Sequence, residues 1–282
     1  MSDDPFRDAV EAAARDLGFT VTRWLPAGVE LTDTIGEMQV VHLVNLARRV
    51  KGTPPDDWPG MVRDFLAVAT RAAPEVESLA GVAGRLRVRL GRPFRADAGQ
   101  ALPWQLPVGG TGLAVNLVVD ADRHMSYVGP ADIESSDAPA EYWLGVALDN
   151  LAASTLAGWL AEVHAASGIR AGNAGDAYDA ARGLVLDRVA PAGPAGWFVA
   201  VPARDWLFAL PVRAAALDHL GVLKAAADRT AAADAYPITD RVFWVRPGGP
   251  FGVWEAVDLT ADPAGVRLDP SAELLAALEA SP

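Results

Sequence analysis

The stretch that decides the fold class is LAVNLVVDADRHMSYV, residues 113–128. Every second residue from Leu113 to Val119 is a branched aliphatic, which is the period of a strand with one buried face. The segment 120–123 supplies polar turn residues, and 124–128 returns as a second strand. Two strands joined by so short a turn must be antiparallel. The sequence therefore predicts an antiparallel hairpin here.

Helices and strands are mixed on both sides of this hairpin. The apolar periodicity predicts further strands at 19–25, 29–33, 37–42, 84–90, 168–172, 196–201, 241–246 and 251–257. It predicts helices at 3–17, 43–50, 57–73, 137–154, 176–187, 212–229 and 271–280. These elements show no regular strand–helix–strand alternation, which indicates an α+β fold.

The chain is long enough for two subdomains. Its 282 residues include a Pro- and Gly-bearing stretch at 91–106, which is the best candidate for a boundary. We therefore predict an N-terminal α+β subdomain over 1–98 and a second α+β subdomain over 99–282. Each is expected to be an antiparallel or mixed sheet packed against helices.

Composition excludes several kinds of chemistry. The chain has no Cys, so it has no disulfide, no thiolate metal ligand and no Cys nucleophile. Its 24 Lys and Arg against 36 Asp and Glu give a net charge of −12. This charge argues against nucleic acid as a partner, because binding phosphates requires clustered cations. The acidic surface permits a basic protein partner without requiring one.

The apolar stretches are too short or too interrupted to span a bilayer, and the acidic N-terminus does not resemble a signal peptide. We therefore expect no membrane partner and a cytoplasmic location. The oligomeric state stays open.

Common catalytic motifs are missing from the sequence. It contains no phosphate-binding G-x-x-x-x-G-K-[ST] loop, no H-E-x-x-H helix and no G-x-S-x-G elbow. We predict no cofactor and no metal site. Asp120 and Asp122 are well suited to the hairpin turn, and whether they also bind a cation is left open.

The best local candidate for a site is the segment GNAGDAYD, residues 172–179. Asp176 can cap the helix predicted at 176–187, and Asp179 lies one turn further on the same side. Together with Tyr178, these carboxylates either bind a ligand or only stabilise the helix start. We treat all three residues as candidate ligand-binding residues.

A second candidate is the end of the strand that begins at residue 196. Arg204 and Asp205 follow an apolar strand and Pro202, a position where polar side chains often line a cleft. The alternative is an Arg–Asp pair in a turn. Asn150 completes the candidate set, because an amide on the apolar stripe of a helix must find partners. It either contacts a ligand or ties down a backbone loop.

Two of these segments carry a family resemblance. DAYDAA at 176–181, followed by AVPARD at 200–205, resembles the YtpQ-like family of bacterial proteins, with its G-Y-D-A-S helix start and V-P-x-x-D strand end. The matching residues are Tyr178, Asp179, Ala180, Pro202 and Asp205. The chain departs from the motif at Ala177, where the family has Gly, and at Ala181, where it has Ser.

The resemblance extends to 147–151 and 236–239, covers about residues 105–255, and reaches the N-terminal third only in outline. It implies a fold and a cytoplasmic bacterial setting. The family has no established activity, so the resemblance implies no mechanism.

Two functional hypotheses follow. The first is a non-catalytic protein that binds a partner protein or a small ligand. It is favoured by the missing catalytic signatures. The second is a hydrolytic or metal-dependent enzyme in which the candidate polar side chains converge in one cleft, namely Asp176, Asp179, Arg204 and Asp205.

Overall fold

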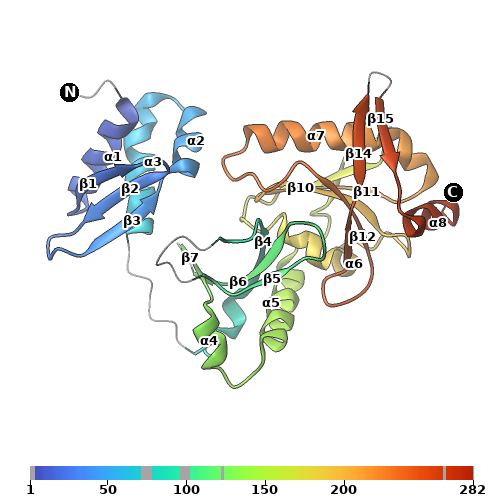
Figure 1. Ribbon diagram of the computed structural model, residues 1–282, viewed down its shortest axis with the longest axis horizontal. Coiled ribbons are helices and arrows are strands. Elements are labelled where there is room, and N and C mark those ends of the chain that lie inside the picture. Colours follow the sequence, from blue (N-terminus) through green and yellow to red (C-terminus); the bar gives the residue numbers. More distant parts are fainter. Residues whose placement is uncertain (1–3, 71–77, 96–101, 122–123, 263–264, 282) are drawn as a thin grey trace. The chain divides into compact units, whose positions relative to one another are not determined.

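The chain forms two units, Met1–Glu75 and Val76–Pro282, and each combines helices with antiparallel sheets (Figure 1). This computed structural model describes residues 4–70, 78–95, 102–121, 124–262 and 265–281. The predicted α+β class is confirmed.

The first unit is a three-stranded antiparallel meander, β1-β2-β3, with helices packed against it. Its elements are α1 (Pro5–Asp16), β1 (Thr20–Leu25), β2 (Gly28–Thr32), β3 (Met38–His42), α2 (Val44–Lys51) and α3 (Trp58–Ala69). Each helix contributes to one shared core, in which Val10, Leu46 and Leu66 meet Leu31 of the central strand. These elements follow the predicted periodicity closely.

The second unit begins with a small antiparallel sheet and a long helix. The elements are β4 (Leu86–Gly91), β5 (Gln105–Pro107), β6 (Ala114–Ala121), β7 (His124–Tyr127), α4 (Pro130–Glu134) and α5 (Ala140–Ser154). β4 pairs with one edge of β6, whereas β5 and β7 pair with the other. The predicted hairpin of residues 113–128 is therefore confirmed.

The rest of the second unit is built on a six-stranded antiparallel sheet of order β13-β12-β10-β11-β9-β8. Its strands are β8 (Ala161–His164), β9 (Ile169–Gly172), β10 (Trp197–Ala203), β11 (Trp206–Pro211), β12 (Val242–Arg246) and β13 (Val253–Ala256). The remaining elements are α6 (Leu186–Val189), α7 (Leu220–Ala233), the hairpin β14 (Asp258–Asp262) and β15 (Gly265–Asp269), and α8 (Ala272–Glu279).

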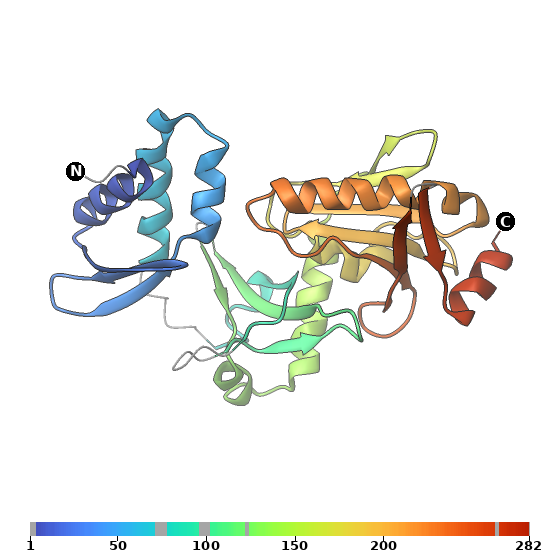
Figure 2. The same cartoon turned by 45° about the horizontal axis from the view of Figure 1, so that its top comes forward.

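Both faces of the six-stranded sheet are covered. All seven residues of β10 are buried, and the first five alternate between two cores. Trp197 and Val199 belong to the core shared with α5 and β6, while Phe198 and Ala200 belong to the core shared with α7 and α8. Figure 2 shows α7, in orange, lying over one face of this sheet.

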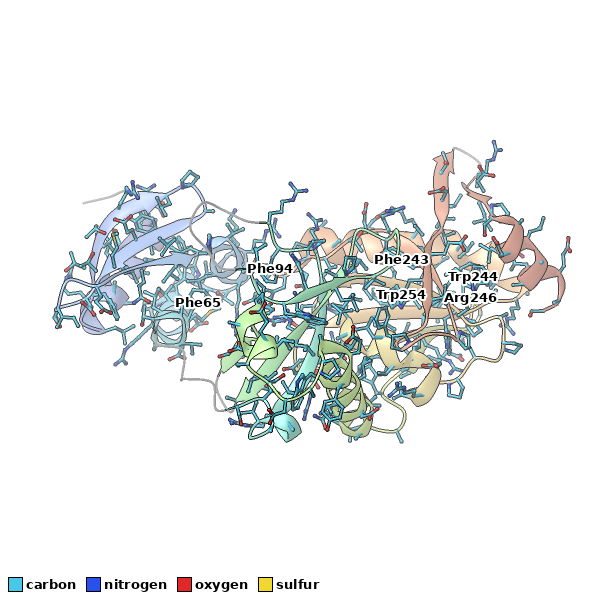
Figure 3. All side chains as sticks on the ribbon, turned by 60° about the horizontal axis from the view of Figure 1, so that its bottom comes forward. Phe65, Phe94, Phe243, Trp244, Arg246 and Trp254 are labelled. Carbon is cyan, nitrogen blue, oxygen red and sulfur yellow. The ribbon has the colours of Figure 1, made fainter. Side chains whose placement is uncertain are left out.

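The strand β12 alternates in the same way. Phe243 belongs to the first core and Trp244 to the second. The ring of Phe243 lies 5.7 Å from that of Trp254 on β13, and the Arg246 guanidinium lies 4.2 Å from the ring centroid of Trp244 (Figure 3). A strand that is buried on both faces must be apolar along most of its length, as both β10 and β12 are.

The predicted domain boundary at 98/99 is wrong, because the chain divides at 75/76. β4 pairs with β6 in register from Leu86↔Val119 to Gly91↔Ala114, so a boundary at 98/99 would divide one sheet. Pro93 and Pro103 lie between β4 and β5, two strands of the same sheet, and Gly99 lies outside the described residues. Interstrand loops and linkers favour the same residue types, so composition did not distinguish them.

Local patterns also missed several strands. β5, β8, β11, β14 and β15 were not predicted. The helix predicted at 212–229 begins as a 3-10 helix, Ala214–His219, before α7. Within the described part of the chain, no helix combines the length and apolar character needed to cross a membrane.

The boundary can be tested by truncation. We expect residues 76–282 to keep a cooperative urea transition, because β4 and its partner β6 stay together. Residues 99–282 lack β4 and its buried Leu86, Val88 and Leu90. Truncation of a buried Leu to Ala alone costs about 2–5 kcal/mol. We therefore expect this shorter chain to give no cooperative transition by circular dichroism. Equal stability of the two fragments would contradict the boundary at 75/76.

Candidate functional site

The segment predicted as a helix over 176–187 is instead a tight loop. The Asp176 carboxylate accepts a hydrogen bond from the Tyr178 amide at 3.1 Å, and Ala177 between them has a left-handed backbone with φ of +72°. A 3-10 helix, Ala181–Val185, follows, and then the single-turn α6. The prediction of a helix N-cap at Asp176 is thus wrong, because this side chain closes a local turn and binds the guanidinium of Arg182.

Asp179 is a fully buried carboxylate that is bonded within the chain. Its Oδ1 accepts from the Trp159 indole at 2.6 Å and the Ala174 amide at 2.8 Å. Its Oδ2 accepts from the Ala174 and Gly175 amides at 2.9 and 3.1 Å. Arg182 adds a contact of 3.2 Å. These bonds occupy the carboxylate, so it anchors the loop rather than facing a ligand.

Arg182 is the cation at the centre of the cluster, and its side chain is 3% exposed. Its Nη1 and Nη2 donate to the two oxygens of Asp176 at 2.8 and 2.6 Å. Its Nε donates to the Thr155 hydroxyl at 3.1 Å, and its Cζ lies 5.3 Å from the ring centroid of Trp159. A buried guanidinium requires such partners, because leaving it unpaired would be costly.

The electrostatics keep both partners of the Asp176–Arg182 pair in the charged form. Burial by itself raises the pKa of Asp176, but the hydrogen bonds and charge of Arg182 outweigh burial and keep that pKa below its ordinary value. Burial by itself lowers the pKa of Arg182, but Asp176 and Asp179 raise it above its ordinary value. A carboxylate with a lowered pKa is poorly suited to donate protons near neutral pH.

A hollow of about 350 Å³ opens beside this cluster. It is lined by Asp176, Arg182 and Trp159, by the turn 154–158, and by Asn173 and Ala174. The Trp159 ring can lie here because Gly172 has no Cβ, and any Cβ at that position would overlap the indole. Most of the polar side chains around the hollow already form hydrogen bonds or ion pairs within the chain.

Tyr178 does not line this hollow. It is 5% exposed and belongs to the core shared with α5 and β6. Burial and the nearby Asp120 carboxylate raise the pKa of its hydroxyl, which has no hydrogen-bond partner among the described residues. The side chain therefore packs in the core as a neutral phenol, and its prediction as a ligand-binding residue is not supported by its position.

Arg204 and Asp205 form the turn between β10 and β11 and bind each other. Arg204 Nη2 donates to Asp205 Oδ2 at 2.8 Å, and the guanidinium lies 3.8 Å from the ring centroid of Tyr236. The carbonyl of Arg204 accepts from the Ala180 amide at 3.1 Å, which joins this turn to the Asp179 loop. The segments are neighbours, but the lining of the hollow includes Asp176 without Arg204 or Asp205. The four side chains do not converge there as the enzyme hypothesis requires.

Asn150 has a structural role. Its Nδ2 donates to the carbonyls of Ala83 and Leu86 at 2.7 and 3.0 Å, so it ties α5 to the start of β4. This geometry matches the expected alternative of a backbone tie rather than ligand binding. Asp122, the second carboxylate of the predicted turn, lies outside the described residues. Among described residues, no group of three or more His, Asp or Glu is arranged to hold a metal ion.

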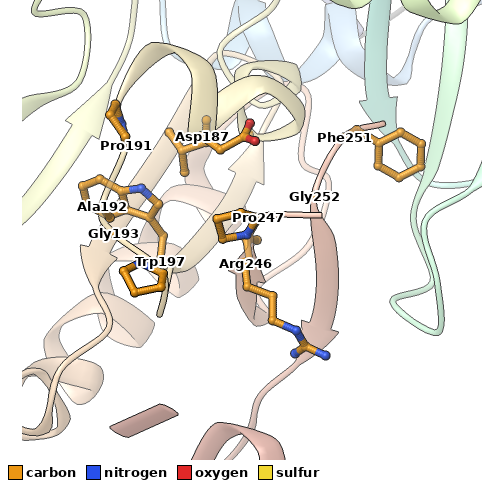
Figure 4. Close-up of a pocket in the computed structure, with 14 residues that line it drawn as sticks. Asp187, Pro191, Ala192, Gly193, Trp197, Arg246, Pro247, Phe251 and Gly252 are labelled. Atoms are coloured by element: carbon orange, nitrogen blue, oxygen red, sulfur yellow. The ribbon is translucent and has the colours of Figure 1, made fainter. Parts of the chain in front are cut away.

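A second pocket, of about 300 Å³, lies where β10 begins and β12 ends, and it was not predicted from the sequence. Two loops with the same pattern, P-x-G-P-x-G, wall it on either side: PAGPAG at 191–196 and PGGPFG at 247–252. Figure 4 shows Pro191, Ala192 and Gly193 on one side and Pro247, Phe251 and Gly252 on the other. This repeated pattern is visible in the sequence and could have indicated that the two loops have a shared role.

Strand pairing brings the two loops together. The first loop leads into β10 and the second follows β12, and these strands are antiparallel neighbours with Trp197 opposite Val245. Gly196 has φ of +76° and approaches the Val245 carbonyl so closely that a Cβ would overlap it. Glycine is therefore required at this junction.

Three indole N–H groups hold these loops in place. Trp197 donates to the Ala190 carbonyl at 3.0 Å and Trp244 to the Ala195 carbonyl at 2.7 Å. Trp254 donates to the Phe251 carbonyl at 3.1 Å. Because the loops are bonded to buried strand residues, the pocket is formed before any ligand arrives.

The pocket lining is mainly apolar. Its ionisable members are Asp187, which is exposed and forms no ion pair with a described residue, and Arg246. Arg246 lies 3.3 Å from Glu255 and also stacks on Trp244. Asp187 is therefore the one charged side chain of the pocket lining that has no ion-pair partner among the described residues.

Substitution of the buried carboxylate tests its anchoring role. Asp179→Asn leaves the buried Arg182 with Asp176 as its one charged partner. It also replaces an oxygen that accepts hydrogen bonds with an NH₂ group, which faces N–H donors and cannot accept from them. We expect a loss of about 3 kcal/mol in the free energy of unfolding, measured in urea. Asp176→Asn, at a side chain that is 43% exposed, should cost less. A larger loss for Asp176→Asn would contradict this ranking.

Backbone strain predicts a stabilising substitution. A left-handed residue with a Cβ costs about 1–2 kcal/mol, so Ala177→Gly should raise the free energy of unfolding by about 0.5–1 kcal/mol after the entropy cost of Gly. Ala180→Gly, at a right-handed position three residues away (φ of −60°), should be destabilising. If both glycines destabilise the chain equally, strain at Ala177 is not present.

Comparison with known proteins gives no match to a family model, a curated protein or a solved structure. The resemblance to the YtpQ-like family stays a prediction. Three of its segments do lie together: the Ala180 amide donates to Arg204, the Arg204 amide donates to Tyr236, and the Ile238 amide donates to Pro202.

Proposed function

We propose that this chain is a non-catalytic binding protein that holds a small apolar ligand in the pocket between the two P-x-G-P-x-G loops. The observation that carries the proposal is the pocket itself: about 300 Å³, walled by Pro, Gly, Trp and Phe. This volume is at the lower end of small-molecule sites, which are mainly apolar and largely preformed.

Preorganisation supports binding. Ordering a loop on association costs free energy, but here the indoles of Trp197, Trp244 and Trp254 already fix both loops. The lining is also rigid because its prolines restrict the backbone. A ligand of matching shape therefore gains the benefit of apolar burial with little loss of loop entropy.

The charges at the pocket narrow the ligand class. Asp187 at the mouth disfavours anions, while Arg246 is engaged by Glu255 and Trp244. An uncharged or cationic ligand fits this arrangement. The described lining offers no nucleophile paired with a base, the arrangement that covalent catalysis requires. The cluster around Arg182 is a weaker enzyme site, because its carboxylates are bonded within the chain.

Two other predictions remain part of the proposal and depend on the sequence. A basic protein partner suits a chain with a net charge of −12. The cytoplasmic location expected above is kept as a proposal.

The test uses N-phenyl-1-naphthylamine, an uncharged fluorescent dye. We expect saturable binding to the full chain at one site. Ala192→Trp places a large ring in the pocket wall and should weaken binding about tenfold, which corresponds to about 1.4 kcal/mol. Ala232→Trp, on the exposed part of α7, is the matched control and should leave the affinity unchanged.

Circular dichroism confirms that both variants are folded before the titrations are compared. Absence of saturable dye binding, or equal affinity of the Ala192→Trp and unsubstituted chains, would refute the proposal.

A further inference from the structure

The first unit contains a groove along one side of α2, independent of the pocket proposed above. Leu46 and Val50 of this helix are buried in the core. A different stripe of the helix lines a hollow of about 340 Å³, and its members are Val44, Ala47, Arg48 and Lys51. The spacing i, i+3, i+4, i+7 places these four residues on one helix face.

The opposite wall of the groove is largely apolar and aromatic. It consists of the start of α1 with Phe6 and Arg7, the end of β1 with Trp24 and Leu25, and Pro26 in the turn that follows. The Arg7 guanidinium lies 4.8 Å from the ring centroid of Trp24, and the Trp24 indole N–H donates to Glu11 at 3.3 Å. The indole is thus fixed in orientation.

The charge of this groove is opposite to that of the chain. Its lining holds Arg7, Arg48 and Lys51 against one acid, Asp4, which lies 3.6 Å from Arg7 and accepts from the first amides of α1. Arg48 and Lys51 are exposed, and neither forms an ion pair with a described residue. α2 itself, VNLARRVK, contains no acid. Two cations therefore stand over an apolar wall in a chain whose net charge is −12.

We infer that this groove binds a small anionic ligand whose anionic group is attached to an aromatic ring. The ring lies against Trp24 and Phe6, and the anionic group lies toward Arg48 and Lys51. Cations beside an apolar surface recognise such amphiphilic anions through charge-assisted hydrogen bonds and apolar burial together. Neither half of the ligand suffices alone, because the cations are solvated and the apolar wall is small.

The probe is phenyl phosphate, titrated into the full chain by calorimetry. We expect a dissociation constant of about 1 mM or lower. Inorganic phosphate, which lacks the ring, and benzyl alcohol, which lacks the anion, should each bind at least about fivefold more weakly. Because the Asp187 pocket disfavours anions, this titration is distinguishable from the dye binding described above.

Matched variants on one helix locate the site. Lys51→Gln should weaken the binding of phenyl phosphate about fivefold. Arg49→Gln is an equal charge change at an exposed residue outside the groove, and it should weaken binding less than about twofold. The inference is overturned if phenyl phosphate does not bind, if inorganic phosphate or benzyl alcohol binds equally well, or if the two variants weaken binding equally. Circular dichroism establishes that both variants are folded.

Discussion

The constraint on which the second unit depends is the burial of β10 on both faces. Its residues 197–201 alternate between two cores, so Trp197 and Phe198 cannot exchange places. A slip of one residue against β12 would reverse every side chain, which fixes the register of Trp197 opposite Val245. That register places the two P-x-G-P-x-G loops side by side, where β10 begins and β12 ends. The proposed pocket is thus a consequence of how the core is packed.

A second constraint is the buried guanidinium of Arg182. A cation at 3% exposure needs acceptors from several directions, and Asp176, Asp179 and Thr155 provide them. The loop before it bends to bring both carboxylates into place, at the cost of a left-handed backbone at Ala177. Residues that look available for chemistry in the sequence are therefore used to balance one buried charge.

Local patterns predicted elements whose burial is simple. The strand β4 has a strict alternation with Leu86 and Val88 on the buried face, and α1, α3 and α8 have a single apolar stripe or clear caps. The strand β11, WLFALP, is a continuous apolar run, which periodicity alone does not assign to strand or helix. The helix expected at 176–187 failed because a capping signal describes the first turn only, while the partner that decides Asp176 lies at Arg182.

The α+β class, the central hairpin, the absence of cysteine chemistry and the acidic charge could all be predicted from the sequence, because they depend on composition and on neighbours a few residues apart. The boundary at 75/76, the anchoring roles of Asp179 and Asn150, and the pairing of Arg204 with Asp205 became evident from the three-dimensional fold. The same fold determines which loops form a pocket. The physical reason is that strand pairing, buried charge and pocket walls each join residues that are far apart in the chain, such as 191–196 and 247–252, and their side chains acquire a role only when those segments meet.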